Sequence, residues 1–248
     1  MRPRTEVQTT PSNARNAPKA WMTTSALSRE AQQFRTHGLQ ALPHAQKRFL
    51  RDLLWNDVST EYDARFLSAW LRGQEVKLGY FSKAFWQTHD LWAAEEERHF
   101  AGLFAVLQSV FPGRDWQAKL ASRSATFEHL EPLLQDEFSV LVAGAFDELV
   151  TVRAYRANLH VYGLVGPLFL DFVHLMIADE ALHYARFLRR LQEDHSSRSG
   201  EAKNIIRGAR AISSAEPYGA TFLLDHKDPE YTTELLDSAE RILVANLA

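Results

Sequence analysis

Two long segments of this sequence each place a glutamate and a histidine three residues apart inside a stripe of apolar side chains. The first pair is Glu96 and His99, and the second is Glu180 and His183. Around each pair, apolar residues recur at steps of three and four, the spacing that puts side chains on one face of an α-helix. Both pairs are therefore expected to face the interior of a helical protein.

The rest of the chain also has a helical pattern. No segment shows sustained alternation of Val, Ile and Thr with polar residues, so the sequence predicts an all-α fold. Ser59 or Thr60 is a suitable N-cap and predicts a separate helix that starts there and ends near Gly73. The expected helices cover residues 25–35, 43–55, 60–73, 82–110, 132–162, 167–194 and 201–212, with a last one from about residue 229.

Composition divides the chain into three parts. Residues 1–24 are rich in Arg, Ser, Thr and Pro and have no apolar period, which predicts a disordered tail. A cleaved organelle-targeting peptide is the alternative for this segment, and otherwise the expected location is the cytoplasm. Residues 25–194 form the helical bundle, and residues 195–248 form a C-terminal helical appendage.

Composition also excludes several classes of function. The chain contains no cysteine, so disulfides, thiolate nucleophiles and cysteine-ligated metal clusters are excluded. The formal net charge of −3 gives no reason to expect binding to nucleic acid. No apolar run is long and uninterrupted enough to predict a membrane span.

Two further glutamates complete a set of metal-ligand candidates. Glu148 lies in the apolar stripe of the helix between the two Glu-x-x-His segments, and Glu61 lies on an earlier helix. Four buried carboxylates need cations nearby, because an unpaired buried charge costs several kcal/mol. Two divalent metals would balance the four negative charges. Glu61 has alternatives in Glu75 and Asp63, and as an acid near a helix start it could instead interact with the helix dipole.

This ligand set is that of ferritin-like di-iron or di-manganese carboxylate bundles, in which two helices each supply a Glu and two each supply a Glu-x-x-His. The expected fold is a ferritin-like four-helix bundle with extra N- and C-terminal helices, and the expected cofactor is two iron ions, with manganese as the alternative. Helical geometry places Glu95 and Glu97 off the buried stripe, with a role as hydrogen-bond acceptor behind the metal ligands as the alternative for Glu95.

The two segments also resemble a known family. Residues 92–99, Trp-Ala-Ala-Glu-Glu-Glu-Arg-His, closely resemble the W-x-A-E-E-N-R-H motif of soluble acyl-carrier-protein desaturases. Residues 178–183, Ala-Asp-Glu-Ala-Leu-His, are similar to that family's A-D-E-K-R-H, and the spacing of the four glutamates is also similar. The resemblance covers residues 58–191.

The resemblance implies a role for each matching residue. Glu96 and Glu180 would bridge or chelate the metals, and the terminal carboxylates would come from Glu61 and Glu148. Asp179 would accept the second N–H of a metal-bound histidine, with a surface acid as the alternative. Thr151 would lie beside the oxygen-binding side of the metals, with simple packing as the alternative. The nitrogen ligands would be His99 and His183.

The implied function is that of an O2-dependent oxidoreductase that desaturates or hydroxylates a carrier-bound acyl chain. Its partners would be the apolar substrate, O2 and a ferredoxin-like electron donor, and a homodimer is expected from the family. Arg186, Arg189 and Arg190 could contact an acidic carrier. The alternatives are a di-iron hydroxylase or N-oxygenase acting on another small substrate and a ferritin-like iron-handling protein. Beyond about Asp194 no correspondence to the family is found.

Two other polar residues in the stripes have structural interpretations. His89 is interpreted as a core histidine with a hydrogen-bond partner, with a role in a substrate pocket as the alternative. Tyr155 is interpreted as a core residue, with redox activity as the alternative.

Overall fold

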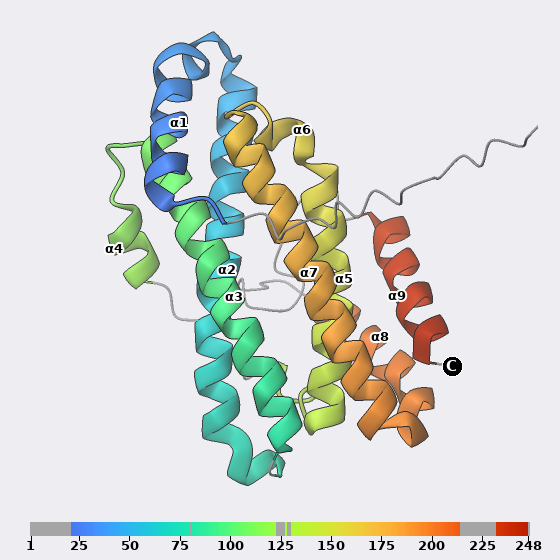
Figure 1. The fold of residues 1–248 in the computed structure, drawn as a ribbon. Helices are drawn as coiled ribbons and strands as arrows, with labels where there is room; N and C mark the ends of the chain where they lie inside the picture. The colour runs from blue at the N-terminus through green and yellow to red at the C-terminus, as the bar shows by residue number, and fades with distance from the viewer. Residues whose placement is uncertain (1–20, 80, 123–126, 128–129, 214–231, 248) are drawn as a thin grey trace, which may run out of the picture.

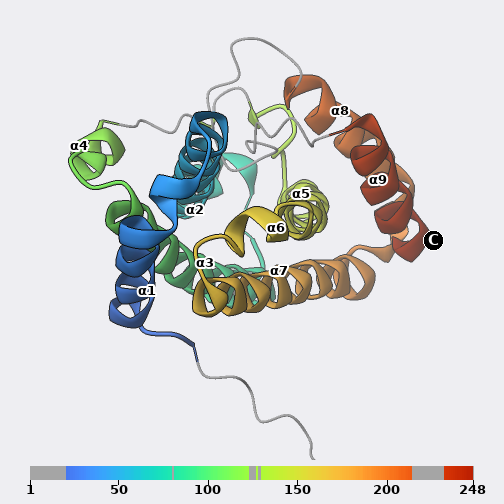
Figure 2. The same ribbon diagram turned by 90° about the horizontal axis from the view of Figure 1, so that it is seen from above.

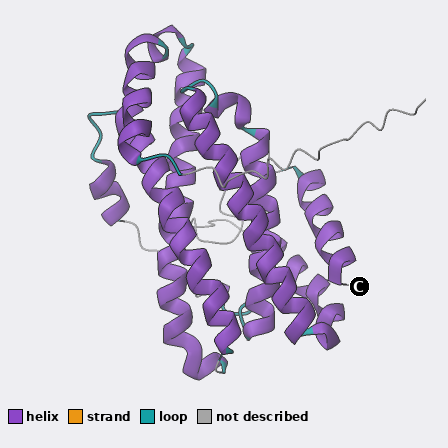
Figure 3. Ribbon diagram, viewed as in Figure 1, coloured by secondary structure: helices purple, strands orange, loops and turns teal. Residues whose placement is uncertain are grey.

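The computed structural model describes residues 21–79, 81–122, 127, 130–213 and 232–247, and over these ranges the regular structure is helical without strands. This confirms the predicted all-α class (Figure 3). The elements in chain order are α1 (Thr24–His37), the 3-10 helix η1 (Leu39–Ala41), α2 (His44–Leu78), α3 (Lys83–Val110), α4 (Trp116–Ala121), α5 (Glu137–Ala157), α6 (Leu159–Tyr162), α7 (Pro167–Asp194), the 3-10 helix η3 (Ser196–Glu201), α8 (Ala202–Ser213) and α9 (Thr233–Leu247).

The long helices α2, α3, α5 and α7 run side by side as a bundle (Figure 1). Helix α3 packs against both α2 and α7, and α5 packs against α7. Seen along the bundle, α1 covers α3 on one side while α8 and α9 cover α5 on the other (Figure 2). The four long helices are therefore flanked by α1 on one side and by α8 and α9 on the other.

Helix α2 is one continuous helix of 35 residues, so the predicted break before residue 60 is wrong. The hydroxyls of Ser59 and Thr60 do not cap a helix start, because each donates to a carbonyl four residues earlier, that of Trp55 at 2.6 Å and that of Asn56 at 3.1 Å. Glu61 consequently lies in the middle of a helix. Its interpretation as a helix-dipole residue is therefore wrong.

The other helix boundaries follow local capping chemistry. Helix α3 starts after Ser82, whose hydroxyl accepts from the Phe85 N–H at 3.0 Å, and α7 has the predicted bounds. Helix α5 is shorter than predicted at both ends: Asp136 caps its start by accepting from the Ser139 N–H at 2.8 Å, and it ends at Ala157, before the separate helix α6. The short helix α4 was not predicted.

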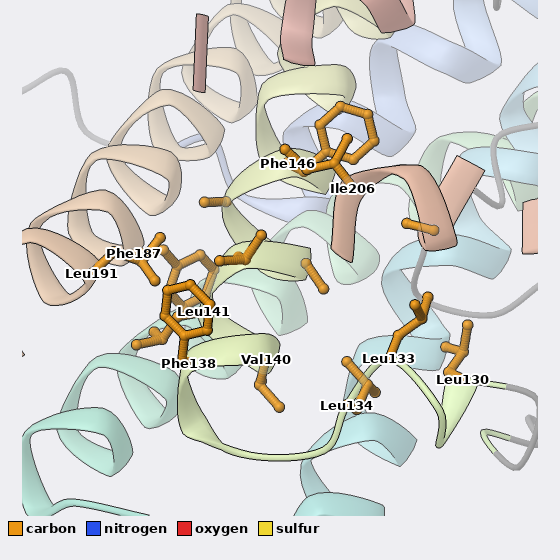
Figure 4. Packing of buried hydrophobic residues seen from close by; sticks show 14 of the residues in the cluster. Leu130, Leu133, Leu134, Phe138, Val140, Leu141, Phe146, Phe187, Leu191 and Ile206 are labelled. Atoms are coloured by element: carbon orange, nitrogen blue, oxygen red, sulfur yellow. The ribbon is translucent and has the colours of Figure 1, made fainter. Parts of the chain in front are cut away.

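Two hydrophobic clusters fill the bundle, one toward each end. The first joins α5, α7 and α8 through residues such as Phe138, Phe187 and Ile206, which Figure 4 shows from close by. On α3, Trp92 belongs to this cluster, whereas Leu103 belongs to the second cluster. The polar residues between these two positions on α3 therefore lie where the clusters meet.

The ends of the chain bear on the predicted three-part division. Residues 21–24 belong to the described structure, and Thr24 begins α1, so the predicted tail can apply only to residues 1–20, which lie outside the described residues. In the predicted appendage, Ile206 of α8 and Leu243 of α9 are buried in the first cluster. None of the helices within the described ranges has the length and apolarity needed to cross a lipid bilayer.

Candidate metal centre

The six predicted metal ligands come together in the middle of the bundle. Their ligand atoms form two groups of four, and within each group all the atoms lie within 4.8 Å of one another. Both groups contain Glu96 of α3 and Glu180 of α7. The first group adds Glu61 and His99, and the second adds Glu148 and His183. The chain thus has two adjoining sets of buried Glu and His side chains that could each hold a metal ion.

The two imidazole rings are oriented alike. The Nδ1 atom of His99 lies 3.1 Å from Glu180 Oε1, and the Nδ1 atom of His183 lies 2.8 Å from Glu180 Oε2. Both rings are fully buried, and their centroids are 6.0 Å apart. Each histidine therefore directs the same ring nitrogen toward the glutamates and the other nitrogen outward.

The outward nitrogens meet two acids that precede the glutamates of the motifs. His183 Nε2 lies 2.9 Å from Glu95 of α3, and His99 Nε2 lies 3.5 Å from Asp179 of α7. The acid of each helix thus faces the histidine of the other helix. Metal-bound histidines commonly donate their second N–H to such a carboxylate, which fixes the orientation of the ring.

Arginines lie behind these two acids. The guanidinium of Arg98 lies 3.3 Å from Asp179 and 3.5 Å from Glu95, and Arg186 donates to Glu95. Burial raises the pKa of Glu95, but the hydrogen bonds from His183 and Arg186 outweigh it and hold this pKa at about 2. Glu95 is therefore a carboxylate at neutral pH and can accept from His183.

The remaining two glutamates are held by aromatic donors. The Trp92 indole N–H donates to Glu148 Oε1 at 2.6 Å, and the Tyr155 hydroxyl donates to Glu61 Oε1. These bonds join α3 to α5 and α5 to α2. In each case one carboxylate oxygen is held by the aromatic donor while the carboxylate remains within the ligand cluster. Both side chains are therefore fixed in orientation.

A small cavity adjoins the carboxylate side of the cluster. It has a volume of about 20 Å³, and its lining includes the four glutamates but neither histidine. Thr151, which was expected beside the oxygen-binding side, also lines this cavity, together with Trp92 and Asp147. A space of this size holds about one water-sized molecule.

The electrostatics of the cluster are dominated by burial, which disfavours charge on a carboxyl group. Burial raises the pKa of Glu61 and of Glu148 well above the ordinary value. At Glu96 the hydrogen bonds from neighbouring side chains outweigh burial and lower the pKa. The carboxylates also outweigh burial at His99 and His183 and raise the pKa of both imidazoles. Glu61, Glu148 and the two imidazoles thus hold protons that divalent cations would displace on binding.

The donors present fit two divalent metal ions. Four buried atoms of these side chains have no hydrogen bond: Oε2 of Glu61, Oε1 of Glu180 and both ring nitrogens of His99. Unsatisfied buried polar atoms are rare in proteins, and a coordinated cation would satisfy those that face the cluster. Carboxylate and imidazole donors suit iron and manganese.

The structure corrects one other prediction made for this region. Glu95 was placed off the buried stripe but is only 7% exposed, because the neighbouring helix α7 covers this side of α3. Glu97 is exposed as predicted, and its carboxylate lies 2.8 Å from Arg65. The proposed carrier patch is partly used within the chain, since Arg186 pairs with Glu95 and Arg190 pairs with acids on its own helix.

Sequence reasoning missed the contact between Tyr155 and Glu61 and the position of Trp21. The ring of Trp21 packs beside the ring of His99, with centroids 5.6 Å apart. Tyr155 is in the apolar stripe two helical turns after Glu148, a position that could have indicated a contact with the cluster. No sequence signal links Trp21 to His99.

Comparison of the chain with protein-family models, with curated proteins and with solved structures found no match in any of the three.

Proposed function

We propose that this chain is a ferritin-like di-iron protein that uses dioxygen to oxidise an organic substrate. The observation that carries the proposal is the pair of four-residue groups that share Glu96 and Glu180. Two metal ions bound between shared carboxylates match the ligand arrangement of ferritin-like di-iron bundles. Iron is favoured over softer metals because the donors are carboxylate oxygens and imidazole nitrogens.

The side chains around the site would have different roles, which depend on their position. Glu61, Glu96, Glu148, Glu180, His99 and His183 would hold the metals, and Glu95 and Asp179 would fix the two imidazoles. Tyr155 and Trp92 would keep the outer glutamates in place. When bound, a pair of iron ions would supply dioxygen reduction and C–H oxidation, with two further electrons from an external ferredoxin-like donor.

The specific substrate in this proposal is a carrier-bound acyl chain that is desaturated or hydroxylated. It rests on the resemblance of residues 92–99 and 178–183 to the motifs of the soluble acyl-carrier-protein desaturases. Apolar side chains beside the ligand cluster, such as Leu103 and Met176, would suit an apolar substrate.

The cavity of about 20 Å³ favours a second candidate function. It has room for dioxygen or water beside the glutamates, whereas an acyl chain requires the helices or side chains around it to move apart. A protein that oxidises and passes on iron needs no organic substrate at this position. Ferritin-like iron handling is therefore the alternative that the cavity supports.

Iron loading tests the metal centre. Anaerobic titration with ferrous iron should give about two ions per chain, and Glu180→Ala should lower this content strongly because it removes a shared ligand. Glu97→Ala is the matched control, since it removes an exposed acid from the neighbouring helix α3. Equal iron loss in both variants, or a single bound zinc without iron uptake, would contradict the proposal.

Substrate assays separate the two functions. The iron-loaded chain is supplied with dioxygen, a reduced ferredoxin and acyl-carrier substrates of different chain lengths, and the products are analysed by mass spectrometry. Loss of two hydrogens or gain of one oxygen by the acyl chain supports the oxidoreductase. Repeated oxidation of excess ferrous iron without any change in the acyl chains supports iron handling.

A further inference from the structure

In Figure 1, α1 leads into α2 at one end of the bundle. The residues lining a second hollow come from this end of the bundle. This hollow is a cleft of about 620 Å³. None of its lining residues belongs to the six metal-ligand candidates or lines the small cavity of about 20 Å³ beside those ligands. Val110, which lines the cleft, follows His99 by eleven residues on α3, roughly 16 Å along the helix axis. The cleft is therefore separate from the candidate metal centre.

The cleft is strongly cationic. Its polar wall combines the last turn of α1, the first two turns of α2 and the turn after α3. No acidic side chain is found among the described residues that line it. Its positively charged residues are Arg35, Lys47, Arg48, Arg51 and Arg114. This concentration of positive charge contrasts with the net charge of −3 on the whole chain.

Internal pairing neutralises only part of this charge. Arg51 is paired with the exposed Asp52 at 2.7 Å, and the Lys47 ammonium donates to the Gln40 carbonyl at 3.2 Å, a bond that does not cancel its charge. Arg35 and Arg48 form no ion pair with any described residue. About four positive charges thus remain on the lining of one cleft, where like charges repel one another and a bound anion would reduce the repulsion.

The arginines of the cleft also indicate the kind of anion. A guanidinium presents a planar set of N–H donors that matches a phosphate group, whereas a lysine acts mainly as a point charge. A phosphate monoester carries up to about two negative charges near neutral pH, so balancing about four positive charges takes two or more phosphate groups. The cleft volume falls within the range of about 300–1,000 Å³ typical of small-molecule sites.

Four of the residues that line the cleft form an apolar wall. Leu39 of η1, Val110 at the end of α3, and the following Phe111 and Pro112 form this wall. Leu39 and Val110 are buried in the second hydrophobic cluster, whereas Phe111 is only partly buried, so the organic part of a phosphate ester could pack against its remaining surface. We infer that the cleft binds a small organic phosphate with two or more phosphate groups, held by the arginines through its phosphates and by Phe111 through its organic part.

Calorimetric titration of the iron-loaded chain tests this site, with ADP, adenosine and inorganic pyrophosphate as probes. ADP should bind more tightly than pyrophosphate, and adenosine should not bind. Raising the salt concentration should weaken the binding of ADP, because exposed charges are screened. In Arg35→Gln/Arg48→Gln the affinity for ADP should fall by about tenfold or more.

Two further variants make the test specific. Lys203→Gln/Arg207→Gln removes the same charge from exposed positions on α8 and should leave ADP binding unchanged. Phe111→Ala should weaken the binding of ADP but not that of pyrophosphate. Iron content and the melting temperature of each variant, measured in parallel, show whether its fold is retained.

Several results would overturn the inference. Failure of ADP to bind, or equal loss of affinity in the two double variants, would exclude the site. Equal affinity for pyrophosphate and ADP would exclude the role of the apolar wall. Binding of polyglutamate, but of neither small phosphate, would make the cleft a docking surface for an acidic protein and the inference wrong.

Discussion

Glu95 and Asp179 occupy equivalent positions around the two histidines but differ in how closely they hold them. Glu95 is buried and lies 2.9 Å from His183, whereas Asp179 is partly exposed and lies 3.5 Å from His99. Glu95→Gln should therefore weaken metal affinity by about 10- to 100-fold, and Asp179→Asn should weaken it less. Anaerobic titration with ferrous iron or cobalt measures both affinities.

Glu97→Gln provides the control for this comparison because it changes an exposed acid two residues from Glu95. Its effect on metal affinity should be negligible. If all three variants bound metal equally well, the outward-facing acids would not position the histidines. Weaker binding by the Asp179 variant than by the Glu95 variant would contradict the predicted order.

The sequence predicted five of the six ligand candidates because each lies in a helical stripe whose period can be read along a single segment, whereas Glu61 was predicted from the spacing of the four glutamates in the family. It could not predict the contacts of Glu95 or Tyr155, since these depend on how two helices are rotated against each other. Glu95 lies off the stripe of α3 by its own helical position, yet α7 covers it. Tyr155 was correctly placed in the core, but its bond to Glu61 crosses from α5 to α2.

His89 makes stability depend on pH at a position away from the ligands. Burial lowers its pKa from 6.5 to about 4, with a smaller raising effect from Asp90 and a lowering effect from Arg72. Its ring stacks on Phe85, and its Nε2 atom lies 2.9 Å from the Ser68 hydroxyl. Between about pH 6.5 and pH 4 the unfolded chain binds a proton at His89 that the folded chain does not. The free energy of unfolding therefore decreases as the pH falls through this range.

The expected loss from this one group is about 3 kcal/mol between pH 7 and pH 4. His89→Phe removes the titration and keeps an aromatic ring in the stack. Urea unfolding of the metal-free wild type and variant at several pH values measures the difference between their free energies of unfolding. Parallel pH profiles for the two proteins would contradict the assignment.

At the scale of helices, the close approach of α3 and α7 depends on Gly102. A Cβ atom at this position would overlap the ring of Phe172, which is itself buried against Trp21. Gly102→Ala should therefore lower the free energy of unfolding by about 1–3 kcal/mol, despite the better helix propensity of alanine. Denaturant unfolding gives this value directly.

Gly73 is the matched control, because it is exposed on α2 and a Cβ atom there would meet no other atom within 4 Å. Gly73→Ala should stabilise the chain by up to about 1 kcal/mol through helix propensity alone. Stabilisation by both substitutions would show that Phe172 can move aside without cost.

The predicted helices were most accurate where a breaker or cap lies in the sequence itself. Gly166 and Pro167 mark the start of α7, and Ser82 marks the start of α3. Helix α2 contains Ser59 and Thr60, which are good N-caps in isolation, yet the helix continues through both residues. Their hydroxyls then bond to carbonyls of the preceding turn, which is the alternative that a helix interior offers.

For the whole molecule, bound metal should contribute a large part of the free energy of unfolding, because the ligands come from four helices, α2, α3, α5 and α7. A metal that binds only the folded chain, present at about 100 times its dissociation constant, adds about 2.7 kcal/mol. Thermal unfolding should therefore shift upward on adding ferrous iron under anaerobic conditions. Glu180→Ala should show a much smaller shift, and an equal shift in that variant would place the stabilising metal elsewhere.

The facing of Glu95 toward His183 and of Asp179 toward His99 has a consequence for protein engineering. Each helix carries part of the support for the other helix's histidine, so neither motif is a portable module. Transplanting residues 95–99 alone into another bundle would bring an imidazole without its acid and an acid without its imidazole. A working graft has to carry both segments, with α3 and α7 kept in the same axial register, because sliding either helix by one residue would separate both pairs at once.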